Sequence, residues 1–395
     1  MYQPCGYLAR VHIPAHIRAV QPFLAMELME RAQEMERGGI HVVHLEIGEP
    51  DFEPPPAALQ ACAEALGSGQ TNYTDSRGLP ELRDAIAADK TRRTGSSVDP
   101  ARVIVTSGTS PAMLMVFGLL LAPGDEVVIP SPHYACYPNF VRFCGGTPVA
   151  VPCDPAAGYA VDVDAVRSAL TPRTRAIVVG TPANPTGAIQ SRETLEALAS
   201  LGVPLVCDEI YDGLVYGDAR VTSALEITDQ AFVLDGFSKR YAMTGFRLGY
   251  VIAPEAALRT LQSLQQNLFI SASEFVQRAG IAALEQGGAT IEAARASLAP
   301  RRRLLIDGLR QLGFEIPVEP EGAFYVFVDA RAFSGDSLAL ANELLDRAHV
   351  AVTPGIDFGA AGEGWLRFCY AAPEADLREA LARLSRWAAA ARPSA

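Results

Sequence analysis

The stretch RAIVVGTPANPTGAIQSRETLEALASLGVPLVCDE, residues 175–209, decides the fold class of this chain. Two short, continuous, β-branched runs, RAIVVG and VPLVCDE, flank the segment SRETLEALASL (191–201), which we interpret as a helix. A strand, a helix and a strand in this order predict a parallel βαβ unit whose helices cover the sheet.

Outward from this unit the same alternation continues. Further apolar runs are expected to be strands buried on both faces; they are RVIVTS (102–107), DEVVIP (125–130), TPVAVP (147–152), AFVLDG (231–236) and RLGYVIA (247–253). VDVDAVRSAL (161–170) is expected to be a helix. The pattern predicts a large, doubly wound, mostly parallel α/β domain over residues 50–285.

The remaining sequence predicts a smaller α+β domain, formed by residues 1–49 plus 286–395. Its expected strands are GAFYVFVD (322–329) and GWLRFCYA (364–371). Its expected helices are a long Ala/Leu/Arg pattern within 284–315, LALANELLDRAHV (338–350) and an amphipathic segment at 375–391.

Composition limits the class of protein. The 395 residues carry a formal net charge of -12, which argues against a nucleic-acid partner. The longest apolar run, 112–122, is too short to span a membrane, and no basic segment followed by an apolar one marks a signal peptide. The seven cysteines include no CxxC pair, and the two histidines of HVVH, His41 and His44, have no further ligands nearby, so no metal site is expected. We expect a reduced, cytoplasmic protein.

Polar residues follow the strands, where ligands bind in open α/β sheets. Ser107 to Pro111 follow RVIVT and open a helix, whose N-terminus can bind a phosphate, although an ordinary capped helix has the same pattern. TPANPTG (181–187) is a rigid loop in which Asn184 can offer an amide to a ligand. Asp208, at the end of a buried strand, needs a cationic or protonated partner, and Tyr211 lies close by in sequence.

Three cations complete the set. Lys239 follows AFVLDGFS, and a buried lysine with a lowered pKa can act as an amine nucleophile or form an imine. Arg247 is expected to begin the next strand and return to the same place. Arg367, inside the apolar WLRFCYA, suits a planar carboxylate. A ligand that binds all these residues would need a phosphate, a ring nitrogen, a phenolic oxygen and an aldehyde. Pyridoxal 5′-phosphate carries all four.

The chain resembles the class I/II aminotransferases, which are aspartate aminotransferase-like, fold-type I pyridoxal-phosphate enzymes. The motifs that carry the resemblance span nearly the whole chain; they are LEIGEPDFEPP (45–55), NYTDSRGLPELRDAIA (72–87), SGTSPAM (107–113), TPANPTG, DEIY (208–211), SKRYAMTGFR (238–247), EGAFYVF (321–327) and VTPGIDFGAAGEGWLRFCYA (352–371). This resemblance implies transfer of an amino group between an L-amino acid and a 2-oxo acid by a ping-pong mechanism.

The resemblance also implies a role for each site residue. Lys239 would form the imine and move the proton, and Asp208 would pair with the ring nitrogen, while Tyr211 and Asn184 would bind the phenolic oxygen. Arg367, with the Gly48 backbone and Asn184 beside it, would bind the substrate carboxylate. Residues expected to contact the phosphate or the ring are Gly108, Thr109, Ser110, Ser238, Arg247, Tyr134 and, across a homodimer interface, Tyr73.

Two positions depart from the pattern of the family. The aromatic residue that stacks on the ring is Tyr134 here, where many relatives have Trp, so the ring contact should survive with less area. A second arginine for a substrate side-chain carboxylate has no secure match, and Arg278 is a weak candidate.

Other functions remain open at this point. A lyase or decarboxylase of the same fold, such as a C–S β-lyase, would share Lys239, Asp208 and Arg367. An α/β-hydrolase with Ser110, Asp208 and His349 has the correct chain order but leaves the lysine idle. A transcription regulator of this fold would need an added DNA-binding domain, for which the forty residues before GEPDF are too few.

Overall fold

The computed structural model describes residues 12–391. Its largest sheet has seven strands in the order β2-β8-β7-β6-β5-β3-β4. Within that sheet only β8 runs antiparallel to its neighbours. The strands are β2 (Val103–Thr106), β3 (Glu126–Ser131), β4 (Thr147–Pro152), β5 (Thr174–Gly180), β6 (Leu205–Asp208), β7 (Phe232–Gly236) and β8 (Gly249–Ile252).

Helices pack on both faces of this sheet. Alternate strand residues face opposite cores, so that Val179 and Cys207 belong to one apolar cluster and Val178 and Val206 to another. The first cluster includes side chains of α4 (Pro80–Thr94), α7 (Val163–Ala169), α8 (Arg192–Ala199) and α10 (Glu274–Gln286). The second includes α5 (Thr109–Leu120), α6 (Tyr137–Phe143) and α9 (Glu255–Leu268). The expected doubly wound, mostly parallel α/β architecture is confirmed.

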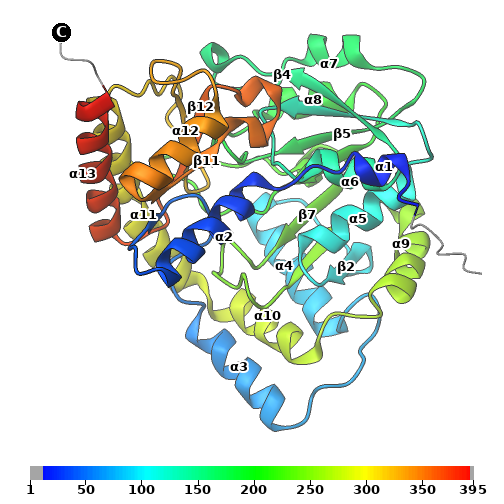
Figure 1. Cartoon of the computed structure of the whole chain (residues 1–395). Coiled ribbons are helices and arrows are strands. Elements are labelled where there is room, and N and C mark those ends of the chain that lie inside the picture. The colour runs from blue at the N-terminus through cyan, green and yellow to red at the C-terminus, as the bar shows by residue number, and fades with distance from the viewer. Residues whose placement is uncertain (1–11, 392–395) are drawn as a thin grey trace, which may run out of the picture.

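A smaller region joins residues near both ends of the chain. Strand β1 (Val43–His44) pairs with β10 (Val350–Ala351), and β11 (Thr353–Pro354), β12 (Trp365–Cys369) and β9 (Tyr325–Asp329) form a three-stranded sheet. The helices of this region are α2 (Leu24–Arg37), α11 (Gly288–Leu312), α12 (Ser337–Glu343) and α13 (Glu374–Ala391). Figure 1 shows α11 and α13 side by side, far from α9. The domain boundaries expected from the sequence stay a prediction.

Two expectations about strands were wrong. Strand β4 is at the edge of the sheet, so most of its residues are exposed or half-buried rather than buried on both faces. Arg247 does not begin a strand, because β8 starts at Gly249 and Arg247 has a left-handed φ of 54°. The short helices α1 (Ala15–Arg18) and α3 (Pro56–Gly67) complete the described elements near the N-terminus. None of the helices in residues 12–391 is both long and apolar enough to cross a membrane.

Candidate active site

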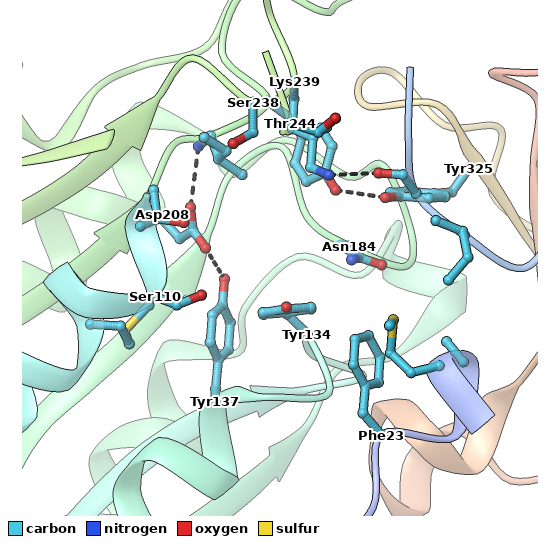
Figure 2. A pocket seen from close by; sticks show the side chains of 18 of the residues that line it. Phe23, Ser110, Tyr134, Tyr137, Asn184, Asp208, Ser238, Lys239, Thr244 and Tyr325 are labelled. Carbon is cyan, nitrogen blue, oxygen red and sulfur yellow. Dashed lines mark hydrogen bonds between the residues drawn. The ribbon is translucent and has the colours of Figure 1, made fainter. Parts of the chain in front are cut away.

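A cavity of about 250 Å³ lies where the carboxyl ends of the central strands meet the smaller region. Figure 2 shows its side chains converging from both regions. Most of the residues predicted from the sequence line it: Gly48, Thr109, Ser110, Tyr134, Asn184, Asp208, Tyr211, Ser238, Lys239, Arg247 and Arg367. The fold therefore gathers in one place residues that are up to about 320 positions apart in the chain.

The first turn of α5 forms an anion cradle at one end of the cavity. Gly108 precedes the helix with φ 95°, and no side chain caps the helix N-terminus. A Cβ at Gly108 would lie 2.6 Å from the Arg247 guanidinium, so glycine allows that cation to approach the free N–H groups. A dianionic phosphate suits this combination of helix N-terminus and arginine.

Asp208 is a buried carboxylate at the end of β6. It accepts hydrogen bonds from the Tyr137 hydroxyl at 2.8 Å and from the Ile210 N–H at 3.2 Å (Figure 2). No ion pair among the described residues includes it, and burial raises its pKa to about 6. A buried carboxylate without a cation is costly. A protonated ring nitrogen would supply the cation that the chain does not, so this residue fits pyridoxal phosphate.

Lys239 lies three residues beyond β7, and its Nζ donates a hydrogen bond to the Gly48 carbonyl oxygen at 2.6 Å. Burial lowers the pKa of Lys239 to about 8. A substantial fraction of the amine is therefore neutral near physiological pH, as attack on an aldehyde requires.

Arg367, on β12, is only 2% exposed. One of its Nη atoms donates to Asn184 Oδ1 at 2.9 Å, and the other donates to the Glu46 carbonyl and to Thr353 Oγ1. Its guanidinium lies over the Tyr325 ring, 4.3 Å from the centroid. The Nε atom is buried without a partner, which leaves its N–H available to a carboxylate.

The wall of the cavity opposite these polar groups is apolar. Phe23 packs edge-on against Tyr134, with ring centroids 6.1 Å apart, and Met26 and Ile47 also line the wall. Figure 2 shows the rings of Phe23 and Tyr134 below the Lys239 side chain.

Sequence reasoning missed three residues that contact the predicted groups. Tyr137 binds Asp208, Tyr325 shares a 2.6 Å hydroxyl–hydroxyl hydrogen bond with Tyr211, and Thr244 lines the cavity. Thr244 and Tyr325 lie inside motifs that carry the resemblance, whereas Tyr137 lies outside them. The signal that could have identified them is a side-chain hydroxyl within a largely apolar stretch of sequence.

Some candidates lie elsewhere. Tyr73 is 86% exposed and does not line the cavity within one chain. Arg278 contacts Gln70, Glu81 and Glu274 rather than the cavity.

The histidines named from the sequence also lie outside the cavity. His349 bonds the Leu345 carbonyl, so the described residues do not assemble the hydrolase triad. His41 accepts from Arg383, whereas His44 contacts Glu36 and Glu46, so the two histidines face different partners.

Comparison with known proteins agrees with this geometry. Residues 40–384 match the family model for aminotransferase class I and II. The chain is 40% identical over 377 residues to the aspartate/prephenate aminotransferase of Thermus thermophilus, covering 94% of this chain and 97% of that protein. It is 39% identical over 375 residues to the valine–pyruvate aminotransferase of Mycobacterium tuberculosis, covering 93% of this chain and 96% of that protein.

Solved structures show the same similarity. An aspartate aminotransferase from Thermus thermophilus with maleate superposes with a TM-score of 0.91 at 39% identity, covering 95% of this chain and all of that one. An aminotransferase from Mycobacterium tuberculosis superposes with a TM-score of 0.92 at 38% identity, covering 96% of this chain and 100% of that one. The match spans both the seven-stranded sheet and the smaller region.

Proposed function

The chain belongs to the class I and II aminotransferases, and from that premise we propose that it uses pyridoxal 5′-phosphate to move an amino group between an L-amino acid and a 2-oxo acid. The observation that carries the proposal is the buried, cation-free carboxylate of Asp208 beside a lysine of lowered pKa. When bound, the cofactor supplies an electron sink for the bond that breaks at the substrate Cα.

The residues of the chain divide the work. Arg367 binds the substrate carboxylate through its unpartnered Nε–H, and this contact fixes the Cα–H bond relative to Lys239. With the cofactor bound, the Lys239 amine would take the proton from the substrate Cα as a general base and deliver it to the cofactor carbon as a general acid. Asp208 holds positive charge on the ring nitrogen, and the Tyr211 hydroxyl and the Asn184 amide bind the phenolic oxygen.

The choice of amino donor is set by the apolar wall. Phe23, Met26 and Ile47 form the side of the cavity away from the cradle, and the cations that line the cavity in the described chain are Lys239, Arg247 and Arg367. Each of these cations already has a role. We therefore expect donors with apolar or aromatic side chains to be accepted, with aspartate as the comparison donor.

The test is a half-reaction with a panel of donors. Purified enzyme should be yellow, and addition of L-valine, L-phenylalanine or L-aspartate should convert the bound cofactor to its amine form without release of ammonia. Stoichiometric ammonia and pyruvate from L-cysteine, tested alongside these donors, would instead indicate the lyase chemistry. Protein that stays colourless with added pyridoxal phosphate would refute the cofactor assignment.

A homodimer with shared sites is part of the proposal. Tyr73 is 86% exposed, and Leu268 and Ile270 are 55% and 47% exposed close to it, since Thr74 N–H donates to Ser271 Oγ at 3.3 Å. Large apolar side chains gathered in this way support an interface. Sedimentation of the holoenzyme at several concentrations tests the dimer, and cell fractionation tests the proposed cytoplasmic location.

A further inference from the structure

A buried ionic cluster lies directly behind the cavity. Its members are Asp89, Lys90 and Arg93 of α4, Glu209 and Asp212 after β6, Asp235 of β7 and Arg240 after Lys239. We call these seven residues the α4 cluster. None of them lines the cavity, and the proposed reaction does not use them directly.

Lys90 is the centre of the α4 cluster. Its side chain is fully buried, and Nζ lies 2.9 Å from Glu209, 2.7 Å from Asp235 and 3.6 Å from Asp212. Although burial opposes the charge, the attraction of Asp235 and Glu209 raises the pKa of Lys90. Removal of this cation would leave buried carboxylates without their partner, which proteins tolerate poorly.

The α4 cluster contacts the segments that contain Asp208 and Lys239 through the residues next to them in the chain. Glu209 directly follows Asp208, and its carboxylate also accepts hydrogen bonds from Ser223 Oγ and the Ala224 N–H, each at 2.9 Å. Successive side chains at a strand end point to opposite sides, so Asp208 enters the cavity while Glu209 enters the cluster.

The same arrangement recurs at the lysine. Arg240 directly follows Lys239, and its guanidinium donates to Asp89 Oδ2 at 3.1 Å. Gly213 allows this path, because a Cβ there would lie 2.8 Å from Arg240 Nε. Asp235, four residues before Lys239, accepts from Lys90, from Arg93 and from the Tyr250 hydroxyl.

We propose that Lys90 is a positioning residue for the proposed amino transfer: through Glu209, Asp235 and the Asp89–Arg240 pair, it fixes the Asp208 segment relative to the Lys239 segment. The inference rests on the proposed function, because it concerns the two groups that would act on the cofactor and the substrate Cα. A loosened cluster would slow the proton step more than it weakens substrate binding, since that step depends on alignment.

The experiment compares Lys90→Met, which keeps the length of the side chain, with Glu126→Gln as a control outside the α4 cluster. The largely buried side chain of Glu126 pairs at 2.5 Å with the exposed side chain of Arg173, at the amino end of β3 and outside the cavity. We expect Lys90→Met to lower the single-turnover rate constant with an amino donor about tenfold while the donor Kd changes less than about threefold. Glu126→Gln should stay within about twofold of wild type for both quantities.

Two further variants keep the result interpretable. Lys90→Met with Glu209→Gln removes the carboxylate that has lost its cation, and should recover most of the rate constant. Arg240→Met breaks the outer contact to Asp89 and removes the guanidinium from the Tyr241 ring, and should give a smaller loss in the same direction even if Lys90→Met does not fold.

A readout that needs no turnover is deuterium exchange of the cofactor-free protein. Amides of residues 208–212 and 237–241 should exchange faster in Lys90→Met than in wild type and in Glu126→Gln. Unchanged exchange, or equal rate losses in Lys90→Met and Glu126→Gln, would overturn the positioning role. A wild-type enzyme that reacts with no donor would instead refute the proposed function.

Discussion

Replacement of Arg367 by lysine separates its charge from its geometry. The lysine would keep one buried positive charge, but it cannot present two parallel N–H groups to a carboxylate. In the structure both Nη atoms already have partners in Asn184, Thr353 and the Glu46 carbonyl, and the donor without a partner is Nε. Arg367→Lys should therefore lose one arm of the contact to the substrate carboxylate.

The expected loss in kcat/KM follows from the loss of this one hydrogen bond to the substrate carboxylate. A hydrogen bond to a charged group contributes about 1.5–3 kcal/mol, and each 1.4 kcal/mol is about a factor of ten. We expect kcat/KM for L-amino acids to fall about 10- to 150-fold. The stack of the guanidinium over Tyr325, at 4.3 Å from the centroid, is lost as well, so the upper part of this range is the better expectation.

The assay is the donor half-reaction, followed by the absorbance of the bound cofactor, with an L-amino acid and with the matching amine that lacks the carboxylate. The variant should be impaired only with the amino acid, because the amine has no carboxylate to lose. Equal loss with both donors would refute the reasoning, since it would mean that Arg367 acts through the fold of the site rather than on the substrate.

Three other predictions concern the remaining groups. Borohydride reduction of the wild-type enzyme should attach the cofactor to the peptide that contains Lys239, and Lys239→Ala should lose both this adduct and multiple turnover; peptide mass spectrometry checks the first and steady-state kinetics the second. Burial raises the pKa of the Asp208 carboxyl from 3.8 to about 6 in the folded state. The free energy of unfolding is therefore highest below the pKa of the unfolded chain, where the carboxyl is neutral in both states, and it falls as the pH rises through the pKa of the folded state. Urea unfolding of the cofactor-free protein should show wild type losing about 3 kcal/mol relative to Asp208→Asn between about pH 4 and pH 7. Tyr73→Ser should weaken cofactor retention, because Tyr73, 86% exposed in one chain, would reach the cofactor of the other chain across the proposed interface; equilibrium dialysis of the variant and the wild type checks this.

The sequence predicted the strands and their polar ends well for a physical reason. Strands buried on both faces must be continuous apolar runs, so Asp208 and Lys239 are conspicuous where those runs stop. The same rule failed for β4, because a β-branched run does not reveal that its strand lies at the edge of the sheet. The position of Arg247 also failed, since a left-handed φ at a residue other than glycine has no signal in one sequence.

Contacts between residues that are far apart in the chain could not be predicted from local sequence patterns. The hydrogen bond from Tyr137 to Asp208 joins residues 71 positions apart, and the pair of Lys90 and Glu209 is separated by 119. In the sequence Lys90 is one charge in a charged helix and resembles a surface residue. In the folded chain its Nζ is buried against Glu209, directly after β6, and Asp235 of β7.

The charges around the cavity are distributed unequally, and this difference is itself an argument for function. Behind the cavity, Lys90 and its carboxylates satisfy one another. Inside the cavity, Asp208 lacks a cation, the Lys239 amine contacts only a carbonyl, and the Arg367 Nε has no partner. A fold selected for stability alone would pair these groups or replace them, because each unpaired buried group costs free energy. Unpartnered donors also occur away from the cavity, at the buried Nε atoms of Arg83 and Arg240. The carboxylates of the α4 cluster have cations beside them, however, whereas Asp208 has none, and a ligand in the cavity can supply that partner.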